Sequence, residues 1–354
     1  MFVKNCWYVA AWTDEVGAED LFSRTILNTP VLFWRDSEHI VRAMIDRCCH
    51  RLAPLSLGKK VNDCIQCNYH GLIFDKNGQC ISAPAQTRLP KMSVQTFPVV
   101  EKNQWIWIWM GDENLADPNL IPDIFWYDHP DWAYKPNGHM HYPVNYLLIA
   151  DNLLDFSHLP FLHPTTLGGS PDYASVLPKV TRNDDGLRLE KMVNNTEAPG
   201  YSKQHAGYDE NTKVDRWMYY DFLIPSILLM DAGMYPTGTG SYEEKPANAI
   251  SFKSAQALTP ETEHSTHYFF GQARDFALDD HAVSDAIYNG IIQAFNEDKE
   301  MILGQQRNIM LNPSHPMKAL SVDSALSQFR WLIDKKIKAE QVETTQQIYT
   351  ENIV

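Results

Sequence analysis

The chain has 354 residues, of which 44% are hydrophobic and 12% aromatic, so it can form a large folded core and is not an intrinsically disordered chain. Its formal net charge of −14 disfavours nucleic acid and anionic membranes as partners, because both are polyanions. The longest nearly apolar stretch, residues 222–230, is far shorter than the ~20 residues that cross a bilayer, and the first residues lack the features of a signal peptide. We therefore expect a cytoplasmic protein of about two domains.

The first third of the chain is predicted to form a small all-β domain. Short β-rich runs cover residues 27–35 and 39–46, and a run of alternating tryptophans at 104–110 reads as a third strand. Two stretches punctuated by Pro and Gly, residues 47–54 and 64–71, are predicted to be loops between these strands.

The two loops contain a set of cysteines and histidines. Cys48 and His50 form a C-x-H pair, and Cys67 and His70 form a C-x2-H pair after 16 intervening residues. Two thiolates and two imidazoles can hold either a tetrahedral zinc ion or a Rieske [2Fe–2S] cluster. In the Rieske cluster each loop supplies one cysteine to one iron and one histidine to the other, as this order permits. The main alternative is a Cys3His zinc site that uses Cys64 as well, and it leaves His50 unexplained.

The rest of the chain is predicted to mix helix and strand. Residues 113–143, rich in Pro, Asp and Trp, are predicted to be a connection, and residues 144–154 a helix. The strongest helix prediction covers residues 283–308, and a second late helix covers 331–343. Strand-like runs lie at residues 187–194, 214–223, 250–258 and 266–273. The predicted fold class is thus α+β, with a β domain at residues 1–115 and an α+β domain at 116–354.

A second candidate metal site follows the first predicted helix. Asn152, Asp155 and His158 recur every three residues and are predicted to share one helix face. Pro160 then disturbs the helix, and the bend can bring His163 back towards His158. Two histidines and one carboxylate form the facial triad of non-haem Fe(II) oxygenases, which leaves positions open for O2. The alternative is a pair of buried, hydrogen-bonded core histidines.

The third ligand is predicted to come from the long late helix. Asp298 lies 11 residues after Ile287 and 7 after Ile291, on the apolar stripe that faces inward. A buried lone carboxylate is costly unless it is paired or bound to a metal, so Asp298 is the candidate ligand, with an inward salt bridge as the alternative. Glu297 and Glu300 fall off this stripe and are predicted to be solvated.

These motifs resemble the Rieske non-haem iron oxygenases. The resemblance lies in Cys48-x-His50-Arg51, Ala53-Pro54-Leu55-Ser56-x-Gly58 and Cys67-x-Tyr69-His70-Gly71. Further segments, Asn5-x-Trp7-Tyr8-Val9-Ala10, Asp112-x-x-Leu115-Ala116-Asp117-Pro118 and Glu297-Asp298-Lys299, are similar to the branch of the vanillate O-demethylase oxygenase components and to dicamba O-demethylase. The resemblance implies a Rieske [2Fe–2S] domain followed by a helix-grip, START-like catalytic domain with mononuclear Fe(II).

The resemblance also implies roles for two further residues and several partners. Asp155 would connect His158 to His70 of the neighbouring subunit in a head-to-tail homotrimer, and Asn152 would lie near the iron. No G-x-G-x-x-G motif follows a strand, so a separate flavin- or ferredoxin-type reductase would bring electrons from NAD(P)H.

The implied reaction is O2-dependent O-demethylation of a methoxylated aromatic acid such as vanillate, with release of formaldehyde. N-demethylation, methyl hydroxylation of a toluenesulfonate and ring dihydroxylation stay open, and an electron carrier or a zinc-stabilised binding module is the alternative outside the enzymes. Candidate pocket residues are Met230, Asp231, Gln256 and Tyr288. The segment 228–233 lacks a basic residue for a carboxylate, which also leaves sulfonated or larger substrates open.

Overall fold

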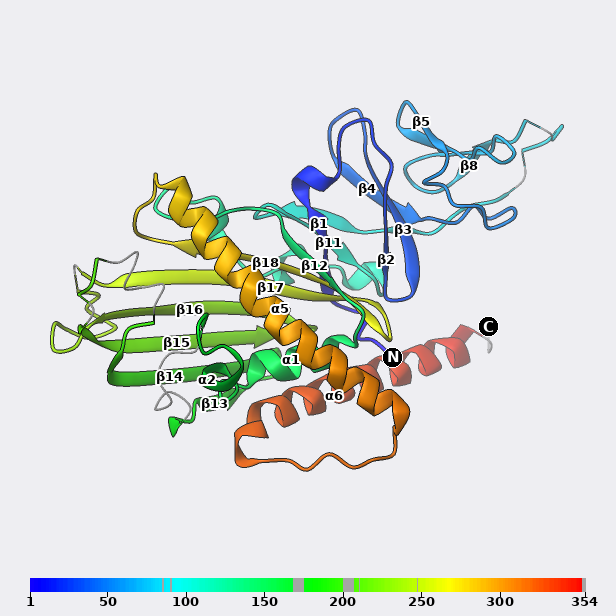
Figure 1. Cartoon of the computed structure of the whole chain (residues 1–354). Helices are drawn as coiled ribbons and strands as arrows, with labels where there is room; N and C mark the ends of the chain where they lie inside the picture. The colour runs from blue at the N-terminus through cyan, green and yellow to red at the C-terminus, as the bar shows by residue number, and fades with distance from the viewer. Residues whose placement is uncertain are drawn as a thin grey trace. The chain divides into compact units, whose positions relative to one another are not determined.

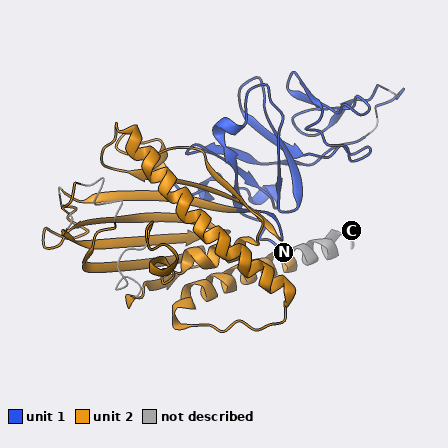
Figure 2. Cartoon of the chain, in the orientation of Figure 1, with its two compact units in different colours: residues 1–123, 259–263 blue, residues 124–258, 264–354 orange. Residues whose placement is uncertain are grey.

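The computed structural model describes residues 1–84, 86–89, 91–167, 175–199, 207–209, 211–246 and 248–351. Two compact units divide the chain, one formed by Met1–Asp123 with Thr259–Glu263 and the other by Ile124–Leu258 with His264–Val354 (Figure 2). The first unit is built from strands and short 3-10 turns, whereas the second combines long strands with helices. The predicted α+β fold class is therefore confirmed.

The first unit contains three small sheets among its described residues, with strand orders β1-β11-β10, β2-β3-β4-β9 and β5-β6-β7-β8. Their bounds are β1 Trp7–Trp12, β2 Phe22–Ile26, β3 Thr29–Arg35, β4 Val41–Ile45, β5 Lys59–Val61, β6 Cys64–Gln66, β7 Ile73–Phe74, β8 Cys80–Ser82, β9 Thr96–Phe97, β10 Val99–Lys102 and β11 Trp105–Trp109. Every residue of β11 is buried between β1 and β10, so its tryptophans form core. The third sheet carries the loop that contains Cys67 and His70.

The second unit is a seven-stranded sheet in the order β12-β18-β17-β16-β15-β14-β13. The strands are β12 Gly138–Tyr142, β13 Lys179–Arg182, β14 Gly186–Glu197, β15 Lys213–Leu223, β16 Ile227–Pro236, β17 Ile250–Thr262 and β18 Ser265–Arg274. Helix α5, His281–Leu311, runs across one face of this sheet, and α1, Tyr146–Leu154, packs against both α5 and α6, Ser324–Glu351 (Figure 1). This helix-against-sheet arrangement encloses the candidate site.

Several elements differ from the sequence-based predictions. Residues 113–143, expected to be a connection, contain β12, and the last helix begins at Ser324, seven residues earlier than expected. Strand β16 was not predicted, because apolar residues occur on both of its faces and hide the alternation of a strand.

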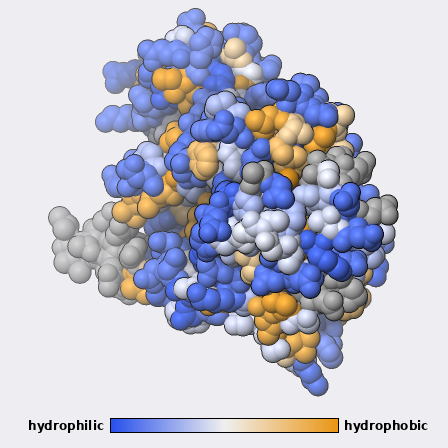
Figure 3. All heavy atoms as spheres, turned by 90° about the vertical axis from the view of Figure 1, so that its left-hand side faces the viewer, coloured by the Kyte–Doolittle hydropathy of each residue, from blue (hydrophilic) through white to orange (hydrophobic). Residues whose placement is uncertain are grey.

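The face drawn in Figure 3 is largely hydrophilic, and its hydrophobic residues form small separate patches. Within the described part of the chain, each helix is too short or too polar to span a bilayer.

Candidate metal centres and substrate cavity

Among the four predicted cluster residues, the two cysteines and the two histidines lie in different surroundings. The side chains of Cys48 and Cys67 are buried, at 1% exposure each, within a hydrophobic cluster that includes Leu55. His50 and His70 are exposed, and their ring centroids lie 4.5 Å apart. The structure thus places the sulfur ligands inside and the imidazoles at the surface of the same unit.

The two cysteine loops share one backbone pattern. The N–H of Cys48 donates to the carbonyl of Ala53 at 2.8 Å, and its carbonyl accepts from the N–H of Leu52 at 2.9 Å. The N–H of Cys67 likewise donates to Leu72 at 2.8 Å, and its carbonyl accepts from Gly71 at 2.9 Å. The fourth residue after each cysteine has positive φ, 58° at Leu52 and 75° at Gly71. Matched turns therefore hold the two cysteines in the same way, and a histidine follows two residues after Cys48 and three residues after Cys67.

The chemistry of these donors fits an iron–sulfur cluster. Burial raises the pKa of Cys48 to about 11, so a thiolate there requires a bound cation to stabilise its charge. A compact Cys3His zinc site would need its donor atoms close together. Within the described residues, the group with three or more metal-binding donor atoms within 4.8 Å of one another contains no cysteine.

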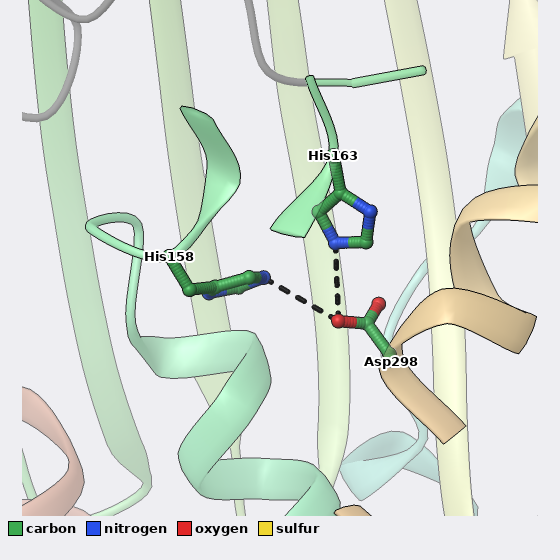
Figure 4. A group of neighbouring side chains, drawn as sticks. All are labelled: His158, His163 and Asp298. Atoms are coloured by element: carbon green, nitrogen blue, oxygen red, sulfur yellow. Dashed lines mark hydrogen bonds and ion pairs between the residues drawn. The ribbon is translucent and has the colours of Figure 1, made fainter. Parts of the chain in front are cut away.

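That group consists of His158, His163 and Asp298, the three predicted iron ligands (Figure 4). His163 Nε2 lies 3.1 Å and His158 Nε2 lies 3.5 Å from Asp298 Oδ1. His163 and Asp298 are buried, at 0% and 5% exposure. Two imidazole nitrogens and one carboxylate oxygen that converge in this way fit a facial triad.

The chain reaches this geometry by ending a helix. The prediction that Asn152, Asp155 and His158 share one helix face was wrong, because α1 ends at Leu154 and Asp155 is extended. The Asp155 carboxylate accepts from the Ser157 N–H at 2.7 Å and thereby holds a turn that competes with the helix. Pro160 lies in the first turn of α2, Leu159–Leu162, where its missing N–H removes no hydrogen bond.

Each histidine is oriented by an acceptor on its other ring nitrogen. His158 Nδ1 donates to the main-chain carbonyl of Asp155 at 2.5 Å, and His163 Nδ1 donates to Glu297 Oε2 at 2.7 Å. These bonds leave both Nε2 atoms facing Asp298, with lone pairs available to a metal. In this subunit the imidazole of His158 therefore contacts the backbone of Asp155.

Asn152 and Glu297 complete the immediate surroundings. Asn152 Nδ2 donates to Asp298 Oδ1 at 2.8 Å, so its predicted position near the site agrees with the structure. The prediction that Glu297 is simply solvated was wrong, since it also accepts from Thr166 Oγ1 at 2.9 Å. Helical spacing alone could not reveal this role, because the loop after α2 covers Glu297.

The electrostatics of the group favour bound positive charge. Burial opposes ionisation of Asp298, but hydrogen bonds from His158 and His163 outweigh it and hold the pKa at about 2. Burial likewise opposes charge on His163, yet Asp298 and Glu297 raise its pKa above the usual value. A metal cation can replace the proton that these carboxylates attract.

A cavity of about 490 Å³ opens onto the three converging side chains. Of the predicted pocket residues, Met230 and Gln256 line it. Asp231 lies on the opposite face of β16, where it accepts from Trp217 Nε1 at 2.8 Å, and Tyr288 packs against Phe270 outside the lining. The sequence analysis missed part of the lining, namely Arg216, Met218, Tyr220, Ala232, Phe252, Ser254 and Ile287. The six strand residues among them alternate along β15 to β17, which is the signal that marks them, whereas Ile287 lies on α5.

An all-β unit with buried cysteines and paired surface histidines, followed by a sheet-and-helix unit with two histidines and an aspartate, defines a Rieske non-haem iron oxygenase. Residues 6–98 match the Rieske [2Fe–2S] domain, and residues 142–339 match the vanillate O-demethylase oxygenase C-terminal domain. The second match covers more than half of the chain, which belongs to this family. It is a terminal oxygenase component, a Rieske-type oxidoreductase with a [2Fe–2S] cluster and a non-haem iron as cofactors.

Relatives of known activity cover nearly the whole chain. The toluene-4-sulfonate monooxygenase system iron–sulfur subunit of Comamonas testosteroni is 46% identical over 96% of this chain and 98% of its own length. The vanillate O-demethylase oxygenase subunit of Pseudomonas sp. (strain HR199 / DSM 7063) is 34% identical over 96% of both chains. The crystal structure of dicamba monooxygenase bound to dicamba has a TM-score of 0.85 and 34% identity, covering 97% of this chain and 99% of that one.

Proposed function

We propose that this oxygenase hydroxylates a methyl group carried by an anionic benzene derivative, with aryl sulfonates as the first substrate class. The observation that carries the proposal is the position of His158, His163 and Asp298 at the wall of a mostly apolar cavity. Its volume of about 490 Å³ is within the range of pockets that enclose a single small ligand. The 46% identity with a toluene-4-sulfonate oxygenase subunit supports the sulfonate in particular.

In this proposal each site residue has a defined role. Cys48, Cys67, His50 and His70 hold the cluster, and His158, His163 and Asp298 hold the mononuclear iron. When bound, the iron supplies O2 activation with electrons that reach it through the cluster. Asn152 restrains the Asp298 carboxylate through its 2.8 Å hydrogen bond, and Glu297 keeps the His163 ring in one orientation and tautomer. The apolar walls keep the aromatic ring against these ligands and exclude water.

Electron supply requires partners. We propose a separate flavin- or ferredoxin-type reductase that uses NAD(P)H in the cytoplasm, as the names of the "oxygenase component" relatives support. We also propose a head-to-tail homotrimer in which His70 of one subunit approaches Asp155 of the next. The exposed apolar side chains of Leu52, Leu57 and Tyr69 beside the cluster histidines support docking at this edge.

O-demethylation of a methoxylated aromatic acid is the second candidate. It requires the same C–H hydroxylation, after which the hemiacetal collapses to a phenol and formaldehyde. The dicamba monooxygenase structure and the vanillate O-demethylase relative favour it. Its substrate also combines an aromatic ring, a methyl carbon and an acidic group.

Product analysis distinguishes the two candidates. The reconstituted holoenzyme, supplied with a surrogate reductase and NADH, should couple O2 uptake to conversion of toluene-4-sulfonate into 4-(hydroxymethyl)benzenesulfonate without formaldehyde. Formaldehyde release from vanillate at a higher kcat/KM would instead establish O-demethylation. Uncoupled NADH oxidation with both acids would refute the proposed substrate class.

A further inference from the structure

The wall of the substrate cavity contains a buried cation. Arg216 lines the cavity and is only 5% exposed. Among the described lining residues it is the single arginine or lysine, while its neighbours on the same face of β15, Met218 and Tyr220, are apolar or aromatic. Arg216 therefore places a positive charge beside apolar and aromatic parts of the cavity wall.

Strand register separates this cation from the metal ligands. Tyr220 packs edge-on against Phe156, with ring centroids 4.7 Å apart, in the segment that precedes His158. Arg216 lies four residues earlier on the same extended strand, so its Cα is about 14 Å from that of Tyr220. The intervening rows, Met218 with Ala232 and then Phe252, are apolar and line the cavity. The cavity thus has an iron-ligand end, an apolar middle and a cationic end.

A second cation adds to the positive charge on this face. Lys191 is 2% exposed and stands opposite Met218 in the β14–β15 pairing, on the same face as Arg216. Burial and, to a smaller extent, the charge of Arg216 lower the pKa of Lys191 to about 8, while the charge of Asp155 opposes this shift. Lys191 and Arg216 thus place two positive charges on one face of the sheet.

We propose that Arg216 binds the acidic group of the aromatic substrate and thereby directs the methyl carbon at the opposite end of the ring toward His158, His163 and Asp298. This assignment rests on the proposed function and deepens it. A guanidinium offers parallel N–H donors that match the paired oxygens of a sulfonate or a carboxylate. The apolar middle of the cavity accepts the aromatic ring. The charged group therefore determines the orientation of the substrate, and the cavity walls limit its size.

Equilibrium binding to the holoenzyme without reductase tests this assignment. The probes are toluene-4-sulfonate, 4-methylbenzoate and the neutral 4-methylbenzenesulfonamide. Arg216→Gln should weaken binding of the two anions about tenfold or more, because it removes a charge-assisted bidentate contact, and should leave the sulfonamide unaffected. The anion whose affinity falls more in this variant identifies the acidic group that the site prefers.

Matched variants keep the test decisive. Arg188 lies on β14 outside the cavity lining and donates to Asp221 Oδ2 at 2.7 Å. Arg188→Gln removes the same charge as Arg216→Gln and should not change binding of the probes. Arg216→Lys keeps the charge but loses the planar fork, so its preference for anion over sulfonamide should fall; this variant carries the test if Arg216→Gln does not fold.

Each outcome has a clear consequence. Unchanged anion affinity in Arg216→Gln, or a wild type that binds sulfonamide as tightly as sulfonate, would overturn the assignment. If wild type hydroxylates the acid while Arg216→Gln binds it normally, the proposed function stands and the Arg216 assignment fails. If Arg216→Gln selectively loses the anions but wild type hydroxylates neither acid, the anion site stands and the proposed function fails.

Discussion

Glu297 shows how one residue outside the ligand set can control a metal centre. Its carboxylate accepts from His163 Nδ1 at 2.7 Å, which fixes the ring and increases its basicity. Glu297→Gln should lower the iron affinity of the mononuclear site roughly 10- to 100-fold, measured by competition with a chelator. The visible absorption of the cluster should not change.

The matched control for Glu297 is one turn away on the same helix. Glu300 is exposed, and Glu300→Gln removes the same charge without contacting His163. Equal iron affinities in the two variants would show that the bond to His163 does not support the metal.

Lys191 makes a pH-dependent contribution to stability. Its pKa is about 8 in the folded protein against the ordinary 10.5, a difference worth about 3 kcal/mol. The unfolded chain binds more protons between these values, so the free energy of unfolding rises with pH across that window, and the full cost is present below pH 8. Lys191→Met should therefore raise the denaturation midpoint at pH 7, and this advantage should shrink toward pH 10.5. An advantage that is the same at both pH values would contradict the burial argument.

At the scale of elements, periodicity predicted the parts with a single buried face. The spacing of Ile287, Ile291 and Asp298 placed the long helix and its inward carboxylate, and α5 confirms both. The break between α1 and α2 could not be predicted in the same way, because a hydrogen bond from Ser157 to Asp155 decides it. Local side-chain bonds of this kind leave little trace in hydrophobic spacing.

An ion pair joins α6 to α1. Arg330 Nε donates to Asp151 Oδ1 at 2.9 Å, and the Asp151 side chain is 17% exposed. Arg330→Met should lower the free energy of unfolding by about 2 kcal/mol, because the carboxylate loses a charge-assisted partner. A double-mutant cycle with Asp151→Asn measures the coupling, and Lys335→Met at the exposed pair with Asp184 is the control. Zero coupling would show that α6 is held by apolar contacts alone.

At the scale of the whole molecule, the sequence allowed more specific predictions about the metal ligands than about the residues that contact the substrate. The spacing of Cys48, His50, Cys67 and His70 predicted the cluster set, because metal ligands occupy short, recognisable motifs. Arg216 gave no such signal, since one arginine in a strand acquires meaning only when the register of β15 places it on the cavity wall.

The proposed homotrimer predicts that activity is shared between chains. Co-expression of a His163→Ala chain with a His70→Ala chain should restore part of the turnover, because the intact cluster of the first can serve the intact iron site of the second. Each variant alone should be inactive, and sedimentation should give a trimer. Mixed trimers without turnover would indicate that the cluster and the iron of one chain act together.

The metal content of the purified holoenzyme tests the central claim most directly. We predict one iron in addition to the two irons and two acid-labile sulfides of the cluster. His163→Ala should lose the single iron and keep the sulfide and the visible absorption. A fully metallated sample that contains zinc and no acid-labile sulfide, or a His163→Ala variant that loses its cluster, would contradict the account.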